Sequence, residues 1–300
     1  MLATVVIPTY KGTKNLLRAV NSVLDQTIAD LEVIIVDDNG KGTEEQRTTE
    51  QLLLDNIADS RLKYIALEKN SGGSAARNKG ASIATGKFIN FLDDDDAIER
   101  TKLEVQINAL TNSHNSFGMA YSSSKIYSEG VLSNIIKATK SGNILYDFLM
   151  GKIKIGTGTV LMYRDVWCKL GGYDENFVRH QDWEFFARVL SNYKAIATPT
   201  VFFERHITNR NLPANVTKAE EYTDQYINFL KNVNLNISTK QLRKVVNYNN
   251  SRIALLYLRQ KDIKKTNQVL GKYDCKPKAF FGFIRFIFVC LRDKLKGVKS

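Results

Sequence analysis

The sequence is poor in the features that cross-link a chain or anchor it in a membrane. Its three cysteines lie far apart without the spacing of metal ligands: Cys168, Cys275 and Cys290. We interpret them as reduced, unpaired thiols of a cytoplasmic protein. No apolar run reaches the roughly 18 residues that a membrane span needs. Residues 4–7 have a strand pattern where a signal peptide would stand. The sequence therefore predicts a globular protein without disulfides or spanning helices.

Basic residues exceed acidic ones, and the excess is uneven along the chain. The net charge is +12 at pH 7, and residues 276–300 contain seven Lys and Arg against one Asp. Half of the excess therefore lies in the last 25 residues. Such a tail indicates an anionic surface as a partner rather than a basic catalytic domain.

Strand and helix patterns alternate through the first hundred residues. Apolar runs typical of buried strands occur at residues 4–7 (ended by Pro8), 31–36, 62–66 and 88–92. Amphipathic segments predict helices at about residues 16–24, 44–57 and 73–84. The chain has 300 residues, 43% of them hydrophobic, which is enough for a large core. We expect an α/β fold with a mainly parallel central sheet flanked by helices.

Polar and glycine residues gather where these strands end, which is where α/β sheets bind ligands. They follow the four strands in turn: Thr9 and Tyr10, Asp37 and Asp38, residues 70–78, and Asp93 to Asp96. Residues 70–78 place glycines before a helix N-terminus with Arg77 on its first turns, an arrangement that suits a diphosphate. The dinucleotide fingerprint differs, because no G-x-G-x-x-G follows the first strand. The pattern predicts a nucleotide-sized site.

The four consecutive acids, residues 93–96, are the most unusual of these features. Adjacent negative charges repel one another and are costly at a sheet edge unless a cation lies among them. The alternative is a helix N-terminus, because acidic residues favour the positive end of a helix, here predicted over residues 99–113. Their position after a buried strand favours a cation site.

Five motifs together resemble a known family. They are V-V-I-P-T-Y (5–10), S-V-L-D-Q-T (22–27), V-D-D-N-G (36–40), N-S-G-G-S-A-A-R-N-K-G (70–80) and F-L-D-D-D-D (91–96). In this order they closely resemble family 2 inverting glycosyltransferases of the GT-A fold, and the likeness covers about the first two hundred residues. The resemblance implies a Rossmann-like sheet, a nucleotide-sugar donor and a divalent metal, Mn²⁺ or Mg²⁺.

The resemblance also implies site residues. Those that would bind the donor are Pro8, Thr9, Tyr10, Asp38, Asn70, Arg77 and Asp94. Those that would hold the metal are Asp95, Asp93, Asp96 and His206. The usual pattern is D-x-D-D and here the x is also Asp, so which acid contacts the metal stays open. His206 lies where related enzymes carry a histidine near the diphosphate, although a histidine after an aromatic strand is otherwise unremarkable.

Residues 171–188, G-G-Y-D-E-N-F-V-R-H-Q-D-W-E-F-F-A-R, resemble the segment of the family that carries the catalytic base. The usual Glu-Asp pair is Gln181-Asp182 here, so Asp182 is the predicted base. Asp182 could also cap the following helix, and the two roles are compatible. His180 could face the acceptor. Glu184 and Arg188 are spaced for a helix salt bridge.

The C-terminal third is predicted to be helical. We divide the chain into a catalytic domain (1–212), a helical bundle (213–275) and a basic aromatic tail (276–300). The tail is rich in Phe, and its basic residues recur near one helical face. We expect an in-plane helix on the anionic inner face of the cell membrane. The alternative is a core helix docked on the bundle.

The predicted function is metal-dependent, inverting transfer of a sugar from a nucleotide diphosphate donor, such as a UDP-sugar, to a saccharide acceptor. The acceptor is expected to be lipid-linked, and the process surface polysaccharide synthesis. One alternative is a nucleotidyltransferase, which needs no base like Asp182. Another is a catalytically silent, membrane-associated nucleotide-sugar binding protein. Nucleic-acid binding is disfavoured, because the basic excess lies in a tail without a recognised module.

Overall fold

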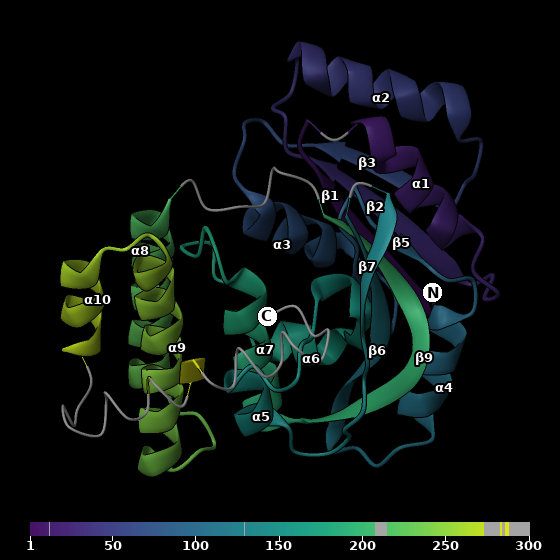
Figure 1. Cartoon of the computed structure of the whole chain (residues 1–300). Helices are drawn as coiled ribbons and strands as arrows, with labels where there is room; N and C mark the ends of the chain where they lie inside the picture. The colour runs from purple at the N-terminus through teal and green to yellow at the C-terminus, as the bar shows by residue number, and fades with distance from the viewer. Residues whose placement is uncertain (12, 129, 208–214, 273–282, 284–285, 288–300) are drawn as a thin grey trace. The chain divides into compact units, whose positions relative to one another are not determined.

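The computed structural model describes the chain except for residues 12, 129, 208–214, 273–282, 284–285 and 288–300 (Figure 1). It forms two compact units. The first comprises Met1–Ile144 and Ile153–Thr208, and the second Leu145–Lys152 and Asn209–Ser300. This division differs from the sequence-based one, which left residues 145–152 in the catalytic domain. The physical reason is packing between distant segments. Gly151 lies so close to Tyr248 of the helical region that an added Cβ would be 2.2 Å from the tyrosine oxygen.

The first unit is built on a nine-stranded sheet of order β3-β2-β1-β4-β8-β6-β9-β5, with β7 paired to β6 (Figure 1). The strands are β1 (Ala3–Thr9), β2 (Leu31–Asp37), β3 (Leu62–Ala66), β4 (Phe88–Phe91), β5 (Ala97–Ile98), β6 (Phe117–Ser128), β7 (Val131–Ile136), β8 (Val160–Tyr163) and β9 (Lys194–Ile207). β1 to β4 are mutually parallel, as predicted. β8 is antiparallel to β4 and β6, and β6 is parallel to β9.

The helices of this unit connect the strands in the predicted alternation. They are α1 (Thr13–Leu24), α2 (Glu44–Asn56), α3 (Gly73–Ile83), α4 (Lys102–Thr111), α6 (Arg164–Lys169) and α7 (Gln181–Asn192), with a 3₁₀ turn at Thr157–Thr159. The α/β fold is therefore confirmed. Helix α4 begins six residues after Asp96, with β5 between them. The acidic run is thus not the N-terminus of this helix.

One predicted boundary is wrong. β1 does not stop at Pro8 but continues to Thr9. The Leu92 N–H donates to the Val6 carbonyl at 3.0 Å, and the registered β1–β4 pairs end at Val6. Pro8 lies on the same side of β1, beyond the last rung, so its missing N–H removes no ladder bond.

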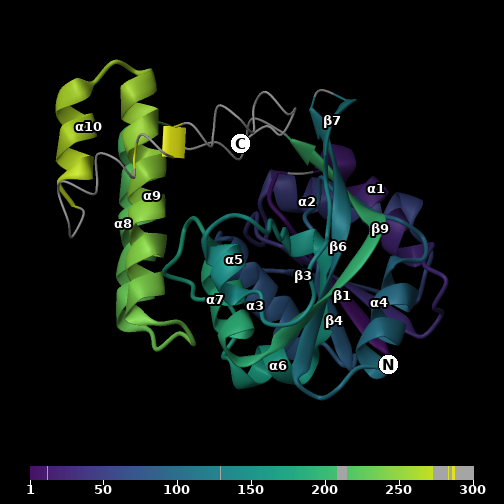
Figure 2. The same cartoon turned by 60° about the horizontal axis from the view of Figure 1, so that its bottom comes forward.

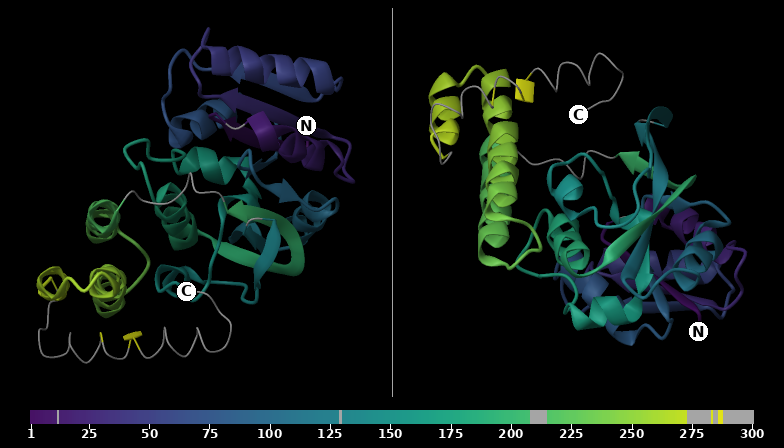
Figure 3. Two further views of the ribbon diagram at one scale, coloured as in Figure 1. Left: turned by 45° about the horizontal axis from the view of Figure 1, so that its top comes forward. Right: turned by 90° about the horizontal axis from the view of Figure 1, so that it is seen from below.

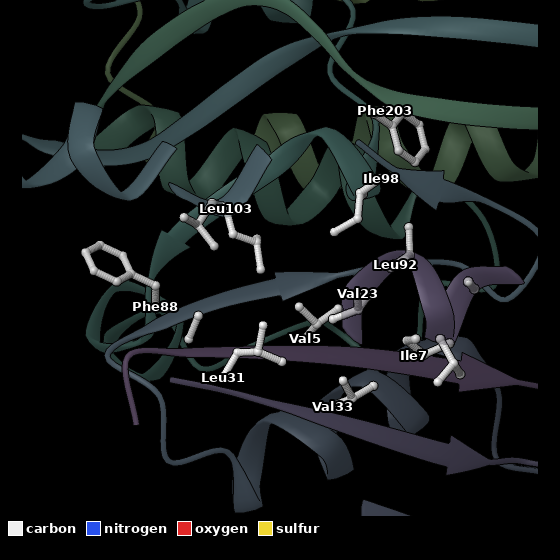
Figure 4. Close-up of a cluster of buried hydrophobic side chains, with 14 of the residues drawn as sticks. Val5, Ile7, Val23, Leu31, Val33, Phe88, Leu92, Ile98, Leu103 and Phe203 are labelled. Carbon is white, nitrogen blue, oxygen red and sulfur yellow. The ribbon is translucent and has the colours of Figure 1, made fainter. Parts of the chain in front are cut away.

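Helices cover both faces of the parallel strands. On one face, Val5, Ile7 and Val33 form a buried cluster with Val23 of α1 and Leu103 of α4 (Figure 4). On the other face α3 lies against β1 and β2. An added Cβ at Gly80 would be 2.3 Å from Val6 Cγ1, so this close packing requires glycine. The two layers hold the strand ends in fixed register.

The second unit contains α5 (Leu145–Leu149), α8 (Val216–Asn232), α9 (Thr239–Arg259) and α10 (Ile263–Leu270). Ile253, Tyr257 and Val269 form a core with Phe283, and Phe286 and Ile287 pack against it. Phe283, Phe286 and Ile287 therefore pack on the bundle, as the alternative of a docked core helix predicts. The rest of residues 276–300 lies outside the described residues. Within the described part of the chain, no helix is long and apolar enough to cross a membrane.

Helix α4 begins with a buried lysine. The Lys102 side chain is 0% exposed, and its Nζ has no hydrogen-bond partner among the described residues. One turn later Gln106 Nε2 donates to the Thr159 carbonyl at 2.8 Å, whereas Gln106 Oε1 and Asn90 Oδ1 have no hydrogen-bond partner in the part of the chain that the structure describes. Burial lowers the pKa of Lys102 to about 7. The charged form of this side chain therefore destabilises the fold.

Lys102→Met should raise the free energy of unfolding at pH 7 by on the order of 3 kcal/mol, because it removes the desolvation cost of the ammonium. The unfolded lysine titrates near its ordinary pKa of about 10.4, so between pH 7 and 10 the unfolded chain binds more protons and wild-type stability rises with pH. The gain should thus shrink to under about 1 kcal/mol near pH 10. Urea unfolding at both pH values measures this.

Lys63→Met is the matched control. The Lys63 Nζ pairs with the buried Glu32 carboxylate at 2.7 Å, so its removal should destabilise the protein. A Lys102→Met variant that is less stable than wild type at pH 7, or that gains equally at pH 10, would contradict the assigned cost.

Candidate active site

The ends of β1, β2 and β4 bring three of the predicted donor residues together. The Thr9 hydroxyl donates to Asp94 Oδ2 at 2.6 Å, and the Asp38 N–H donates to the Thr9 carbonyl at 2.8 Å. All three residues are buried. Pro8 is half-buried within β1, and Tyr10 beyond it is 45% exposed. The strand ends therefore form one polar edge, as the parallel order requires.

The Asp38 carboxylate organises the glycine-rich loop. Its two oxygens accept the N–H groups of Ser71 at 2.6 Å and Gly72 at 2.8 Å. The Asn70 side-chain amide donates to the Asp38 carbonyl at 3.1 Å. Burial raises the pKa of Asp38, and the two N–H donors oppose that rise. Asp38 and Asn70, both predicted to bind the donor, thus fix the loop that starts α3.

Arg77 connects the acidic run to the base segment. Its guanidinium donates to Asp93 Oδ1 at 2.6 Å and to Gln181 Oε1 at 3.1 Å, and it lies 5.7 Å from the centre of the Tyr173 ring. Its Nε is buried and has no hydrogen-bond partner among the described residues. An added Cβ at Gly73 would be 2.9 Å from the guanidinium, so this glycine leaves room for it. The predicted contact of Arg77 with the nucleotide stays a prediction.

The acidic run is held from three directions. Besides the Thr9 contact, Asp96 Oδ1 accepts the His206 N–H at 2.8 Å, and Arg18 of α1 donates to the Asp95 carbonyl. Asp94 to Asp96 are buried. Burial raises the pKa of Asp96 well above its usual range, and the neighbouring charges of Asp93 and Asp95 add to the rise. Negative charge is therefore crowded here at a cost.

His206 lies beside this run at the end of β9. Its ring stacks on Tyr127 with centroids 4.9 Å apart and planes 9° from parallel. Burial, with help from the Arg18 charge, lowers the pKa of His206. Its Nε2 is buried and has no hydrogen-bond partner among the described residues. A neutral imidazole with an unused ring nitrogen beside carboxylates suits a metal ligand.

Asp182 lies in the first turn of α7 and not at its cap. The cap is His180, whose backbone is left-handed with φ +61, and its side chain makes no capping bond. The His180 ring stacks on Trp183 with centroids 4.3 Å apart. Asp182 Oδ1 accepts the Trp183 N–H at 3.0 Å. Burial raises the pKa of Asp182, opposed by that N–H and by the nearby charge of Arg77. The alternative role of Asp182 as helix cap is therefore wrong.

Two contacts that the sequence did not reveal position the base segment from either side. The Asn78 amide of α3 donates to the Tyr173 carbonyl and accepts the Tyr173 N–H, both at 2.9 Å. The predicted pair of Arg188 and Glu184 is confirmed, at 2.5 Å, and Arg188 also donates to the Gly172 carbonyl at 2.7 Å. The place of Asn78 within the 70–80 motif was the only available signal. The loop before α7 is thus fixed to α3.

The described residues contain no group of three His, Cys, Asp or Glu side chains arranged to hold a metal ion. Asp96 nevertheless accepts the backbone N–H of His206, and the charge of Asp95 acts on the His206 ring. The fold also places Asp182 within the electrostatic reach of Arg77 and Asp93. The strand ends and the base segment therefore form one site.

The sequence is similar to those of known glycosyltransferases. The protein is 27% identical over 219 residues to a UDP-Glc:alpha-D-GlcNAc-diphosphoundecaprenol beta-1,3-glucosyltransferase of Escherichia coli, covering 72% of this chain and 81% of that one. It is 29% identical over 224 residues to a putative teichuronic acid biosynthesis glycosyltransferase of Bacillus subtilis, covering 74% and 85%.

Solved structures show the same fold. Residues 1–349 of S. aureus TarS in complex with UDP-GlcNAc superpose with a TM-score of 0.63 at 17% identity, covering 90% of each chain. The mannosyltransferase PcManGT of Pyrobaculum calidifontis, in complex with GDP-Man and Mn2+, gives 0.61 at 16% identity, covering 96% and 80%. The model of the glycosyl transferase family 2 matches residues 4–170, more than half of the chain. This protein therefore belongs to glycosyl transferase family 2.

Proposed function

We propose that this glycosyltransferase moves a sugar from a UDP-sugar to a hydroxyl of a lipid-linked saccharide, with inversion, in surface polysaccharide synthesis. The observation that carries the proposal is the Arg77 guanidinium, which contacts both Asp93 at the strand end and Gln181 beside Asp182. A group-transferring enzyme needs its leaving-group site and its base within one substrate length of each other. This contact supplies that proximity.

The donor and acceptor classes rest on relatives. The E. coli relative is named for UDP-Glc and a diphosphoundecaprenol acceptor, and TarS was solved with UDP-GlcNAc. PcManGT was solved with a GDP-sugar, so the fold alone does not select the base. We assign the nucleotide to the edge formed by Pro8, Thr9, Tyr10, Asp38 and Asn70, with Asp94 and Arg77 beside it.

The donor atoms at the acidic run fit a divalent cation. Carboxylates of Asp93, Asp95 and Asp96 are the hard oxygen ligands that Mg²⁺ and Mn²⁺ prefer. His206 donates its backbone N–H to Asp96, and its buried Nε2 has no hydrogen-bond partner among the described residues. Mg²⁺ in such sites is commonly held by one or two carboxylates together with substrate phosphates, so a group of three protein ligands is not required. When bound, the cation supplies charge neutralisation for the departing diphosphate.

Asp182 takes the acceptor proton in this proposal. Its raised pKa makes the carboxylate a better base than an ordinary aspartate, while the nearby charge of Arg77 opposes the rise and favours the ionised form. One base and one displacement on the opposite face of the sugar give inversion. The α7 N-terminus and the Trp183 N–H orient the carboxyl group.

We further propose that the enzyme is cytoplasmic and peripheral on the inner face of the cell membrane, where a lipid-linked acceptor would be presented. The acceptor class named for the E. coli relative supports this location. Release of UDP from UDP-sugars with Mn²⁺, measured without and with acceptor, separates a transferase from a silent nucleotide-sugar binder.

Asp95→Ala should abolish Mn²⁺-dependent UDP binding and transfer while leaving the fold intact, because a strand-end acid does not carry the core. Isothermal calorimetry with UDP and Mn²⁺ measures the binding, and circular dichroism checks the fold. Glu68→Ala removes one exposed carboxylate elsewhere and serves as the charge-matched control. Wild-type UDP affinity in Asp95→Ala would refute the metal assignment.

Asp182→Asn should lower kcat by about 10² or more, with donor affinity little changed, because the amide keeps the shape but cannot accept a proton. In the wild type, kcat/KM should fall at acid pH as Asp182 is protonated, and burial should place that fall higher than for an ordinary aspartate. Steady-state rates across pH test both statements. Asp174→Asn, in the same segment, is the control. Retention of most turnover by Asp182→Asn would assign the base elsewhere, with His180 the next candidate.

A further inference from the structure

The net positive charge of this protein comes entirely from its second unit. Residues 1–144 and 153–208 contain 23 Lys and Arg against 24 Asp and Glu, a net charge of −1. Residues 145–152 and 209–300 contain 20 against 7, a net charge of +13. The tail 276–300 accounts for +6 of this. The rest of the second unit is therefore basic in its own right.

The acidic side chains of α8 to α10 are already engaged. Glu220 accepts the Tyr257 hydroxyl at 2.7 Å and pairs with Lys272, which also pairs with Asp224. Glu221 pairs with Lys218, and Asp262 Oδ1 accepts the Lys265 N–H as the cap of α10. The exposed basic residues that have no acidic partner among the described residues are Lys231, Lys240, Arg243, Lys244, Arg259, Lys261 and Lys264. They remain available to an external anion.

Four basic residues gather at the turn that joins α9 to α10 (Figure 2). We call Arg259, Lys261, Ile263, Lys264 and Lys265 the basic tip. Ile263 is 55% exposed in their midst. The other basic group, at Lys240, Arg243 and Lys244, starts α9 and lies about 25 to 30 Å along the same helix, since each residue rises about 1.5 Å. Residues 239–244, which are all described, include no exposed large hydrophobic side chain comparable to Ile263.

The basic tip breaks two local rules of stability. Lys261 has a left-handed backbone with φ +62, a conformation that favours glycine or asparagine. Lys264 and Lys265 occupy the first turn of α10, where the helix dipole disfavours cations, and the Asp262 cap adds one negative charge against their two positive ones. Residues that oppose local stability are expected at functional sites.

We propose that the basic tip docks this protein on an anionic lipid bilayer. Lysine and arginine at this turn would contact anionic headgroups, and Ile263 would enter the interface between them. The bilayer as the source of anionic groups rests on the proposed function, whose acceptor is lipid-linked. The three helices lie side by side, and Figure 3 shows α9 between α8 and α10. The tip is therefore held on a packed scaffold and not on an isolated loop.

The test compares two variants of the full chain that remove three charges each. The first, Lys261→Asn with Lys264→Gln and Lys265→Gln, changes the basic tip, and the second, Lys240→Gln with Arg243→Gln and Lys244→Gln, changes the start of α9. Co-sedimentation with vesicles of phosphatidylcholine and phosphatidylglycerol measures partitioning. The tip variant should lose about tenfold or more, and the control less than about threefold. Ile263→Ser should weaken binding without a change in charge.

Stability provides the independent readout. The tip variant should melt at the same temperature as wild type or higher, because asparagine suits the left-handed turn and neutral residues suit the helix start. A melting temperature at or above that of wild type would show that loss of binding does not result from unfolding. Binding is measured without donor, and release of UDP from soluble UDP-sugar is measured separately, so failure of the glycosyltransferase proposal would be visible on its own.

Four results would overturn the proposal. These are equal losses in the two triple variants, no sedimentation of wild type at low salt, equal binding to pure phosphatidylcholine vesicles, and binding to duplex DNA as strong as to anionic vesicles. The first would indicate diffuse charge without a docking site. The last would indicate a nucleic-acid partner.

Discussion

The Arg77 guanidinium is the interaction on which the proposed site depends. It donates to Asp93 after β4 and to Gln181 at the start of α7, two residues that lie on separate segments of the chain. Its own placement requires Gly73, which leaves space for it, and Tyr173, whose ring it covers. This cation gives the predicted donor edge and the predicted base segment a direct polar link, in addition to the hydrogen bonds between Asn78 and Tyr173. Gln181 in place of the usual acid suits the arrangement, because Asp93 already neutralises Arg77.

The acidic run shows how a fold retains an unfavourable charge arrangement. Thr9 donates to Asp94, the His206 backbone donates to Asp96, and Arg18 donates to the Asp95 carbonyl. These contacts orient the loop but do not cancel its charge, as the raised pKa of Asp96 indicates. Strain of this kind is expected where a ligand completes the electrostatics. Lys102 of α4 is a second costly charge, since its Nζ is buried without a hydrogen-bond partner among the residues that the structure describes.

The two units separate chemistry from charge. The first unit contains every residue assigned to donor, metal and base, yet its net charge is −1. The second unit contributes none of those residues and contains the whole basic excess. The residues assigned to the site and the basic residues that would meet an anionic surface therefore lie in different units. Substitutions can change one without the other, which makes the two proposals separable.

Much of the first unit was predictable from sequence, because its signals are local. Apolar runs, glycine before α3 and acids after β4 depend only on neighbouring residues, and β1 to β4 with their helices lie where these patterns indicate. The site residues of the first hundred positions were brought together by the parallel strand order, which the alternation also implied.

Contacts between distant segments were decided only by the tertiary structure. The Arg77–Gln181 hydrogen bond spans 104 residues, and no local pattern encodes it. The same holds for Asn78 against Tyr173, for the left-handed cap at His180 and for the burial of Lys102. Pro8 remains within β1 because β4 ends before it, a fact about the neighbouring strand. Sequence by itself determined which elements form, since periodicity is a property of a segment. Tertiary structure decided which polar groups are paired, because a hydrogen bond or ion pair needs two residues that only the fold brings together.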